Sequence, residues 1–305
     1  MFLFETLSVG TILMWIGVTL GLIALNELAR LNKWVSLVLF IAVPAVLTIF
    51  VWPNTSGADS STGTWFHWVK VYSALAGCLG FMAIRFIPKC RNKYWLMFPP
   101  FILAFNILEA VIRDFQVFGM KANGIVDGVM MVSGPWNLLN GIAGLINIIT
   151  ITGWMGIYVS KKRGNDMMWP DMIWPWIIAY DIWNFAYVYN CVSDHSFYAG
   201  AALLASCTIA HFVMKKGAWL EHRAQTLAFW MMFTMSVPSF VSDSKFSVDA
   251  SHKPAAWLTV SVLSIIINIS VLVYQIYRMK KYHTNPLKEE IYKGTHEYEV
   301  AAADR

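Results

Sequence analysis

The sequence contains few charged residues. Only 13% of its 305 residues are Asp, Glu, Lys or Arg, whereas 57% are apolar, and a soluble domain usually carries about 25% charged residues. A large soluble core could absorb some apolar excess, but not a halving of the charge. The composition predicts an integral membrane protein. The net charge of +5 does not indicate nucleic-acid binding, because the basic residues form short clusters at the ends of apolar runs.

Motifs for metal and cofactor chemistry are also missing. None of the four cysteines forms a Cys-x-x-Cys pair, which argues against a metal site, and with only Cys191 expected outside the cytoplasm we expect no structural disulfide. There is no Gly-rich nucleotide loop, no His-Glu-x-x-His motif and no Gly-x-Ser-x-Gly elbow. We therefore expect no metal, no cofactor and no direct use of ATP, and the sequence favours a protein that is not an enzyme without deciding the question.

Long apolar runs are what the chain contains instead. Each has about 20 residues, the length that crosses a bilayer as a helix, and none alternates as a strand would. They predict an all-α polytopic bundle of about nine transmembrane helices. The runs cover residues 6–28, 34–52, 65–88, 94–118, 136–159, 170–190, 197–214, 224–241 and 255–278.

The connections between the runs alternate in basic charge. Of the 23 Lys and Arg residues, 18 fall in or beside alternate connections and the tail, whereas residues 53–64 and the connection around Asp194 have none. Basic residues are enriched on the cytoplasmic side of a membrane. This predicts an N-terminus outside the cytoplasm and a cytoplasmic C-terminus, with a transmembrane domain over residues 1–278 and a tail over residues 279–305. The apolar but Gly-rich connection from Gly119 to Pro135 fits either a re-entrant or interfacial segment or an early start of the fifth helix.

The fourth run carries polar residues on one helical face. Their spacing of three, four and three residues places them on one stripe, on which Glu109 and Arg113 can form an i,i+4 ion pair. Charged groups inside a membrane are costly and usually face the interior of a bundle. The stripe fits either an ion pair that fixes helix packing or a substrate or ion site. Its members are Asn106, Glu109, Arg113 and Gln116.

The fifth and sixth runs add amides and one carboxylate. Asn137, Asn140 and Asn147 share a face with small residues, which favours close helix packing but also suits a polar ligand. Asp181 lies near the middle of the sixth run, with Asn184 one turn later. A carboxylate without an opposite charge in its own helix requires a partner from another helix or a proton. Asp181 is therefore the predicted coupling or substrate carboxylate.

Three segments carry a resemblance to a known group. Residues 1–8, the stretch from Asn26 to Leu28, and residues 134–141 (GPWNLLNG) resemble bacterial polytopic membrane proteins classified only as a domain of unknown function. The resemblance covers most of the chain. It implies a multi-pass protein of the bacterial cytoplasmic (inner) membrane, and it carries no activity and no site residues.

These observations lead to one functional hypothesis and two alternatives. We expect a secondary transporter that moves a small polar solute through the lipid bilayer, coupled to a proton or sodium ion, with an outward-open polar cavity. The alternatives are an intramembrane enzyme that acts on a lipid, and a membrane sensor or assembly factor that works through its cytoplasmic tail. The candidate substrate- or ion-binding residues are Asp181, Asn184, Glu109, Arg113, Asn106, Asn137, Asn140 and Asn147.

Overall fold

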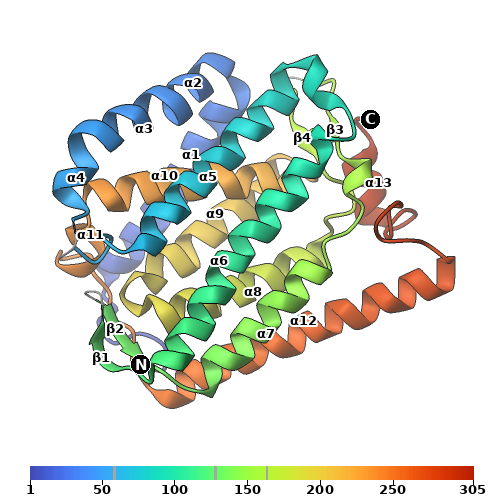
Figure 1. Cartoon of the computed structure of the whole chain (residues 1–305). Helices are drawn as coiled ribbons and strands as arrows, with labels where there is room; N and C mark the ends of the chain where they lie inside the picture. The colour runs from blue at the N-terminus through green and yellow to red at the C-terminus, as the bar shows by residue number, and fades with distance from the viewer. Residues whose placement is uncertain (58–59, 127–128, 163) are drawn as a thin grey trace.

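The computed structural model, which describes residues 1–57, 60–126, 129–162 and 164–305, is a bundle of helices (Figure 1). Two short two-stranded sheets are the only paired strands among these residues, so the expected all-α class is confirmed. Within the described ranges, six helical segments are long and apolar enough to cross a membrane. They are Val9–Leu31, Lys33–Thr55, Trp65–Phe86, Trp95–Met120, Ser193–Met214 and Pro254–Tyr282.

The first half of the chain forms five long helical segments. The first begins at a capping box, in which the Ser8 side chain accepts from the backbone N–H of Thr11 and the Thr11 hydroxyl accepts from that of Ser8. The second alternates α-helical and π-helical turns. The helices are α1 (Val9–Leu31), α2 (Lys33–Leu37), α3 (Val43–Val46), α4 (Trp52–Thr55), α5 (Trp65–Phe86), α6 (Phe98–Met120) and α7 (Pro135–Ile149).

The second half adds four more long segments and a short terminal helix. Residues 193–214 combine 3-10, π and α turns around one α-helical stretch. The last long helix continues to residue 282, so the expected domain boundary at 278 lies inside it. The helices are α8 (Trp174–Cys191), α9 (Leu203–Ile209), α10 (Trp219–Ser236), α11 (Ser239–Ser242), α12 (Pro254–Tyr282) and α13 (His296–Ala302).

Helix α10 begins five residues before the apolar run that predicted it. Its first turns carry Glu221 and Arg223, which the hydropathy pattern assigned to a connection. Both are buried, and Glu221 forms an ion pair with the fully buried Arg85 of α5. Arg85 and Arg223, which were counted beside basic connections, thus lie inside α5 and α10, where groups of neighbouring helices contact them. The fifth run is also shorter than expected, since α7 ends at Ile149.

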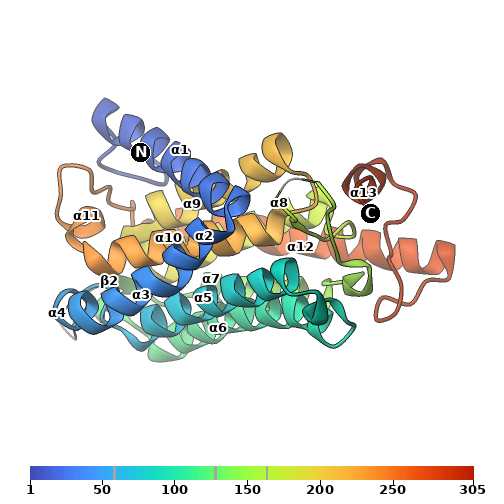
Figure 2. The same ribbon diagram turned by 90° about the horizontal axis from the view of Figure 1, so that it is seen from above.

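Helix α10 lies in the middle of the bundle. It packs against α5 on one side and against α1 and α9 on the other, as the view from above shows (Figure 2). Helices α7, α8 and α12 pack against one another, and α6 packs on α7. Every residue of α10 from Trp219 to Met232 is buried, so this helix can place side chains inside the molecule.

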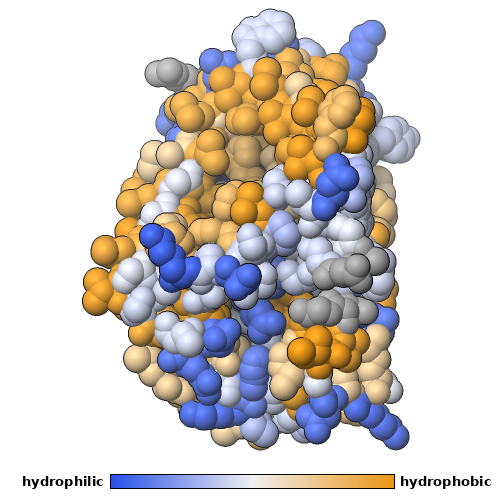
Figure 3. All heavy atoms as spheres, turned by 90° about the vertical axis from the view of Figure 1, so that its left-hand side faces the viewer, coloured by the Kyte–Doolittle hydropathy of each residue, from blue (hydrophilic) through white to orange (hydrophobic). Residues whose placement is uncertain are grey.

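The connections gather at two ends of the bundle. One end, here the hairpin end, carries α4, α11, residue 1 and the hairpin β1 (Asn123–Val126)–β2 (Val129–Val132) (Figure 1). The other, the tail end, carries β3 (Tyr158–Val159), β4 (Met167–Met168) and α13. Viewed onto the hairpin end, polar side chains gather across the middle and lower part of the molecule, with apolar side chains around them (Figure 3).

The Gly-rich connection between α6 and α7 forms the hairpin rather than an early start of α7. Val129 and Met131 are buried, the Ser193 hydroxyl donates to the carbonyl of Met130, and Ser133 donates to the carbonyl of Val117 at the end of α6. The hairpin thus covers the ends of α6 and α8. Asp127 and Gly128 lie outside the described residues, as does Arg163 of the basic connection before α8.

The tail folds back onto the tail end. Asp171 accepts hydrogen bonds from the backbone N–H groups of Ile291 and Tyr292 and from the Thr152 hydroxyl, at 2.8–3.1 Å. Burial raises the pKa of Asp171 to about 6, although these hydrogen bonds oppose the shift. Asp304 pairs with Lys162 and Lys215, which lowers its pKa. Residues 291–305 are therefore an ordered part of the structure.

Candidate functional site

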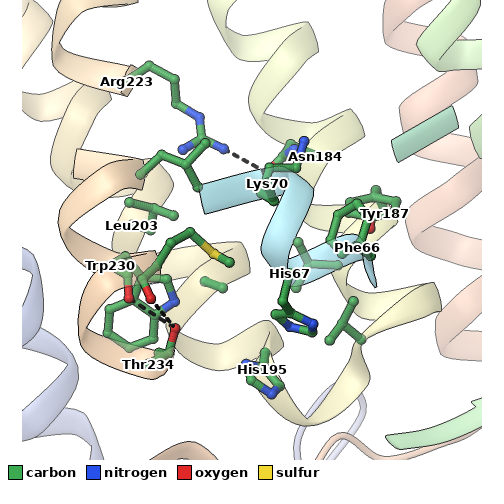
Figure 4. Close-up of a pocket in the computed structure, with 15 residues that line it drawn as sticks. Phe66, His67, Lys70, Asn184, Tyr187, His195, Leu203, Arg223, Trp230 and Thr234 are labelled. Atoms are coloured by element: carbon green, nitrogen blue, oxygen red, sulfur yellow. Dashed lines mark hydrogen bonds between the residues drawn. The ribbon is translucent and has the colours of Figure 1, made fainter. Parts of the chain in front are cut away.

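A cavity of about 60 Å³ lies between α5, α8, α10 and residues 192–203. We call it the central cavity. A water molecule needs roughly 10–15 Å³ of such space, so the cavity has room for several waters or a small organic molecule. Polar side chains face it from α5, α8, α10 and the turn at residues 193–195, and apolar side chains form the remaining wall (Figure 4). The lining includes His67, Lys70, Asn184, Tyr187, His195, Arg223 and Thr234, together with Phe66, Leu203, Trp230 and Met231.

Arg223 extends from α10 into this space. Its Nη2 donates to Asn184 Oδ1 at 3.4 Å and its Nε donates to the Tyr180 hydroxyl at 3.3 Å. Its Nη1 is buried and has no hydrogen-bond partner among the described residues. Arg223 is only 5% exposed. A buried guanidinium with a free N–H edge is costly unless a ligand or ordered water satisfies it. Asn184 was a predicted site residue, and it orients this arginine.

Lys70 enters the cavity from α5, and a carboxylate of the neighbouring helix α6 neutralises its charge. Its Nζ lies 2.7 Å from Glu109 Oε2 of α6 and donates to the backbone carbonyl of Asn106 at 2.8 Å. The Ser73 hydroxyl also donates to Glu109, at 3.4 Å. The structure thus pairs Glu109 with Lys70 of the neighbouring helix, where the i,i+4 spacing indicated Arg113. Glu109 and Asn106 reach the cavity through Lys70.

Three more polar groups face the cavity from the side of the hairpin end. The rings of His67 and His195 lie 5.6 Å apart, and Thr64 hydrogen-bonds His67 Nδ1 at 2.9 Å. His195 Nε2 and the Tyr187 hydroxyl are buried without a partner among the described residues. Both side chains are 3% exposed. With Arg223 Nη1, three unpartnered polar atoms belong to side chains that line one small space.

Asp181 lies beside the cavity and not in its lining. Its Oδ2 accepts from the Thr208 hydroxyl of α9 at 2.6 Å, and Trp219 Nε1 donates to the same hydroxyl at 3.3 Å. Oδ1 is buried without a hydrogen-bond partner in the part of the chain that the structure describes. Within the described residues Asp181 forms no ion pair, although Arg223 is close enough to act on it electrostatically. Asp181 therefore has a hydrogen-bond partner from another helix, as a carboxylate in an apolar helix requires. That partner is the Thr208 hydroxyl.

Arg113 lies near the hairpin end of α6. Its Nη1 donates to Gln116 Oε1 at 3.0 Å, and its Nη2 lies 3.7 Å from the sulfur of Met131 in β2. Arg113 also has a further interaction. This side chain connects α6 to the hairpin and does not line the central cavity.

The asparagines of α7 lie in a separate polar cluster. Asn137 and Asn140 both donate to the buried carboxylate of Asp114, at 3.3 and 2.8 Å. Asn140 also accepts from Ser264 at 2.8 Å, and Asn147 donates to Asn268 at 2.7 Å. These bonds join α6, α7 and α12 into what we call the polar seam. Its members are Asp114, Asn137, Asn140, Asn147, Ser264 and Asn268.

Three important residues escaped the sequence analysis. Asp114 is completely buried. It follows Arg113 directly and therefore lies on the helix face next to the polar stripe of the fourth run. Arg223 was hidden by its position before an apolar run, and His195 by its place in an expected connection. A charged residue inside a predicted helix is a signal in itself, and this signal could have found Asp114.

The chemistry available in the cavity is hydrogen-bond donation. No group of three or more His, Cys, Asp or Glu side chains that could hold a metal ion occurs in the described ranges, and the four cysteines are free. Arg223, Lys70, Tyr187 and the histidines supply N–H and O–H groups. This arrangement can bind and orient a polar molecule inside the bundle.

Comparisons with known proteins point to one family. Neither the curated proteins nor the solved structures include a significant match to this chain. A family model described as "Family of unknown function (DUF5692)" matches residues 5–304. This confirms the expected resemblance to a domain of unknown function, and the chain belongs to that family.

Proposed function

We propose that this protein is a secondary transporter that binds a small polar solute in the central cavity and carries it across a bacterial cytoplasmic membrane. The bundle would cross the membrane nine times, with the hairpin end outside and the tail end in the cytoplasm. The alternation of basic connections supports this topology. So does the arrangement of the structure, in which connections with few basic residues share the hairpin end (Figure 1).

The observation that carries the proposal is the unsatisfied lining of the cavity. Arg223 Nη1, Tyr187 Oη and His195 Nε2 are buried without hydrogen-bond partners in the described part of the chain. Buried polar groups nearly always have partners, and each exception requires an explanation. Small-solute sites in transporters lie near the middle of the bundle, between helices. A bound solute would supply the partners that these three groups lack.

In this proposal Asp181 keeps its predicted role, and Asn184 acts on the solute through Arg223. Asp181 is the coupling group, because one of its oxygens is held by Thr208 while the other is buried and free to take a proton or contact a sodium ion. Asn184 positions Arg223 for the solute. Asn137, Asn140 and Asn147 remain predicted to orient the solute, although their hydrogen bonds in the structure are made within the polar seam.

A two-stage experiment tests the proposal. The full chain, purified in detergent, is heated with each member of a library of small metabolites, since a ligand that binds only the folded state raises Tm. Hits are then measured as labelled solutes in counterflow into proteoliposomes. We expect at least one solute to exchange, with activity lost in Arg223→Lys, which keeps the charge but not the planar N–H edge. Tyr198→Phe is the matched control, since Tyr198 donates to the carbonyl of Phe246 and does not line the cavity. A library without hits contradicts the proposal.

The ordered tail favours a second candidate function, that of a sensor or assembly factor. Residues 291–305 are held by Asp171, Lys162 and Lys215, so a partner that binds the tail could compete with these contacts. This candidate predicts that deleting residues 286–305 abolishes function while Asp181→Asn does not. The transporter proposal predicts the reverse for Asp181→Asn, with loss of coupled uptake.

A further inference from the structure

We infer that the solute of the central cavity is a small monocarboxylate with a short apolar tail. This inference rests on the proposed function and names the class of its substrate. It follows from the charges, the hydrogen-bond donors and the apolar wall of the cavity, each of which restricts the solute.

The lining attracts an anion. It contains Lys70, Arg223 and two histidines, and none of its described members is acidic. Glu109 already neutralises Lys70 at 2.7 Å. Arg223 is the remaining full positive charge in the lining, and in the described ranges no ion pair of Arg223 occurs. One unpaired cation suits a monovalent anion. A divalent anion would keep an uncompensated charge in a site shielded from water.

The unpartnered atoms of the lining are suited to a carboxylate. Arg223 donates to Asn184 through Nη2 (Figure 4). Its Nε donates to Tyr180, which leaves Nη1 for a ligand. The Tyr187 hydroxyl can donate to a carboxylate oxygen, and His195 Nε2 can donate in one of its tautomers. An anion that accepts from arginine forms a charge-assisted hydrogen bond, about twice as strong as a neutral one.

The rest of the cavity is apolar and small. The wall around the polar groups is formed by the apolar side chains of Phe66, Leu203, Trp230 and Met231. The labelled Leu203 and Trp230 lie across the space from Tyr187 and Phe66 (Figure 4). A volume of about 60 Å³ accommodates a few heavy atoms. A carboxylate with a hydrocarbon tail of two to four carbons would place its head at Arg223 and its tail against this wall, by roughly the size limit of such a space.

The test compares solutes of one shape and different charge. Sodium butyrate, butyramide and butylammonium chloride are titrated into the detergent-purified full chain at constant ionic strength, and binding is measured by calorimetry and by the shift in Tm. Formate, propionate and hexanoate extend the carboxylate series. We expect saturable binding of butyrate or propionate, weaker binding of formate and hexanoate, and no saturation by the amide or the ammonium ion.

Tyr187→Phe is the decisive variant. The Tyr187 hydroxyl has no partner in the described protein, so its removal leaves folding intact but should weaken carboxylate binding roughly ten- to a hundredfold, the cost of one hydrogen bond to a charged group. Arg223→Gln should abolish measurable binding. Tyr198→Phe, outside the cavity, should bind the carboxylate as the wild-type chain does.

Two results would overturn the inference. In the first, butyramide or butylammonium saturates the cavity and no carboxylate does, which leaves transport of a polar solute standing with a different substrate class. In the second, a carboxylate binds but Tyr187→Phe and Arg223→Gln bind it unchanged, which places the anion elsewhere. Failure of the proposed function is distinct, because then no solute of any charge exchanges in proteoliposomes.

Discussion

The polar seam and the central cavity differ in how many of their buried polar atoms have hydrogen-bond partners: among the described residues of the seam, only Asn147 Oδ1 has none. In the seam, the carboxylate of Asp114 accepts from Asn137, Asn140 and the thiol of Cys191. In the cavity, Arg223, Tyr187 and His195 keep atoms without partners in the described structure. Polar residues in a membrane bundle can fix helix packing or bind a solute, and closure of their hydrogen bonds separates the two roles. The hydrogen bonds that the α7 stripe makes in the structure are of the packing kind.

The largest effect should come from Asp114. Asp114→Ala removes the acceptor of three buried donors, so we expect the free energy of unfolding to fall by about 3 kcal/mol. Chemical unfolding in mixed micelles measures the loss, with the exposed Asp243→Ala as the control. If Asp114→Ala were as stable as wild type, the seam would not be the packing element described above.

Asp171 extends the comparison to a buried carboxylate at the tail end. Its pKa is raised to about 6, so its contribution to tail docking is complete below its ordinary value near 4 and is lost as the pH rises through about 6. We expect hydrogen exchange of residues 291–292 to be faster at pH 7.5 than at pH 5 after correction for intrinsic rates. The difference should correspond to about 1.4 kcal/mol. In Asp171→Asn this part of the pH dependence should disappear, and an unchanged profile would assign it to another group.

Variants of Asn147 and Asn268 test whether the hydrogen bond between these two residues stabilises the fold. Asn147→Ala leaves the acceptor of Asn268 unused and should cost about 1 kcal/mol in unfolding free energy. Replacing both by Ala removes both partners and should cost less than the sum of Asn147→Ala and Asn268→Ala. A double-mutant cycle gives the coupling energy, and strict additivity would mean that the 2.7 Å contact contributes nothing.

The smallest effect on stability should come from the cavity. Because His195 Nε2 has no partner in the described residues, His195→Leu should change the free energy of unfolding by less than about 0.5 kcal/mol, or raise it. The same variant should weaken solute binding. A destabilisation comparable to that of Asp114→Ala would erase the distinction between cavity and seam.

The all-α class and the positions of most long helices could be predicted from the apolar runs, because a run of about 20 residues is long enough for one helix. The prediction is wrong at α10, whose beginning contains Glu221, His222 and Arg223. These residues interrupt the apolar pattern, and partners from other helices stabilise each of them in the interior. Arg85 pairs with Glu221, Asn26 hydrogen-bonds His222, and Tyr180 and Asn184 accept from Arg223.

The site was harder to predict for a related reason. Asp181 and Asn184 were found because a polar residue in an apolar run is visible in sequence, and Asn184 lines the cavity. Which polar residues come into contact depends on the rotation of each helix and on its neighbours. Residue spacing within one helix gives no information on either. The pairing of Glu109 with Lys70 and of Asn137 with Asp114 required the packing of separate helices.

Short connections at both ends restrict how the cavity could open. At the hairpin end, Leu3 accepts from Tyr189 of α8 and from Ser251 before α12. At the tail end, Asp171 before α8 holds Tyr292 beyond α12. Helices α8 and α12 are thus tied at both ends, and with α7, which packs against both, they form one block. A motion that admitted a solute would have to take place along the joint between this block and the pair α5–α10, with Arg223 on one side of the joint and Asn184 on the other.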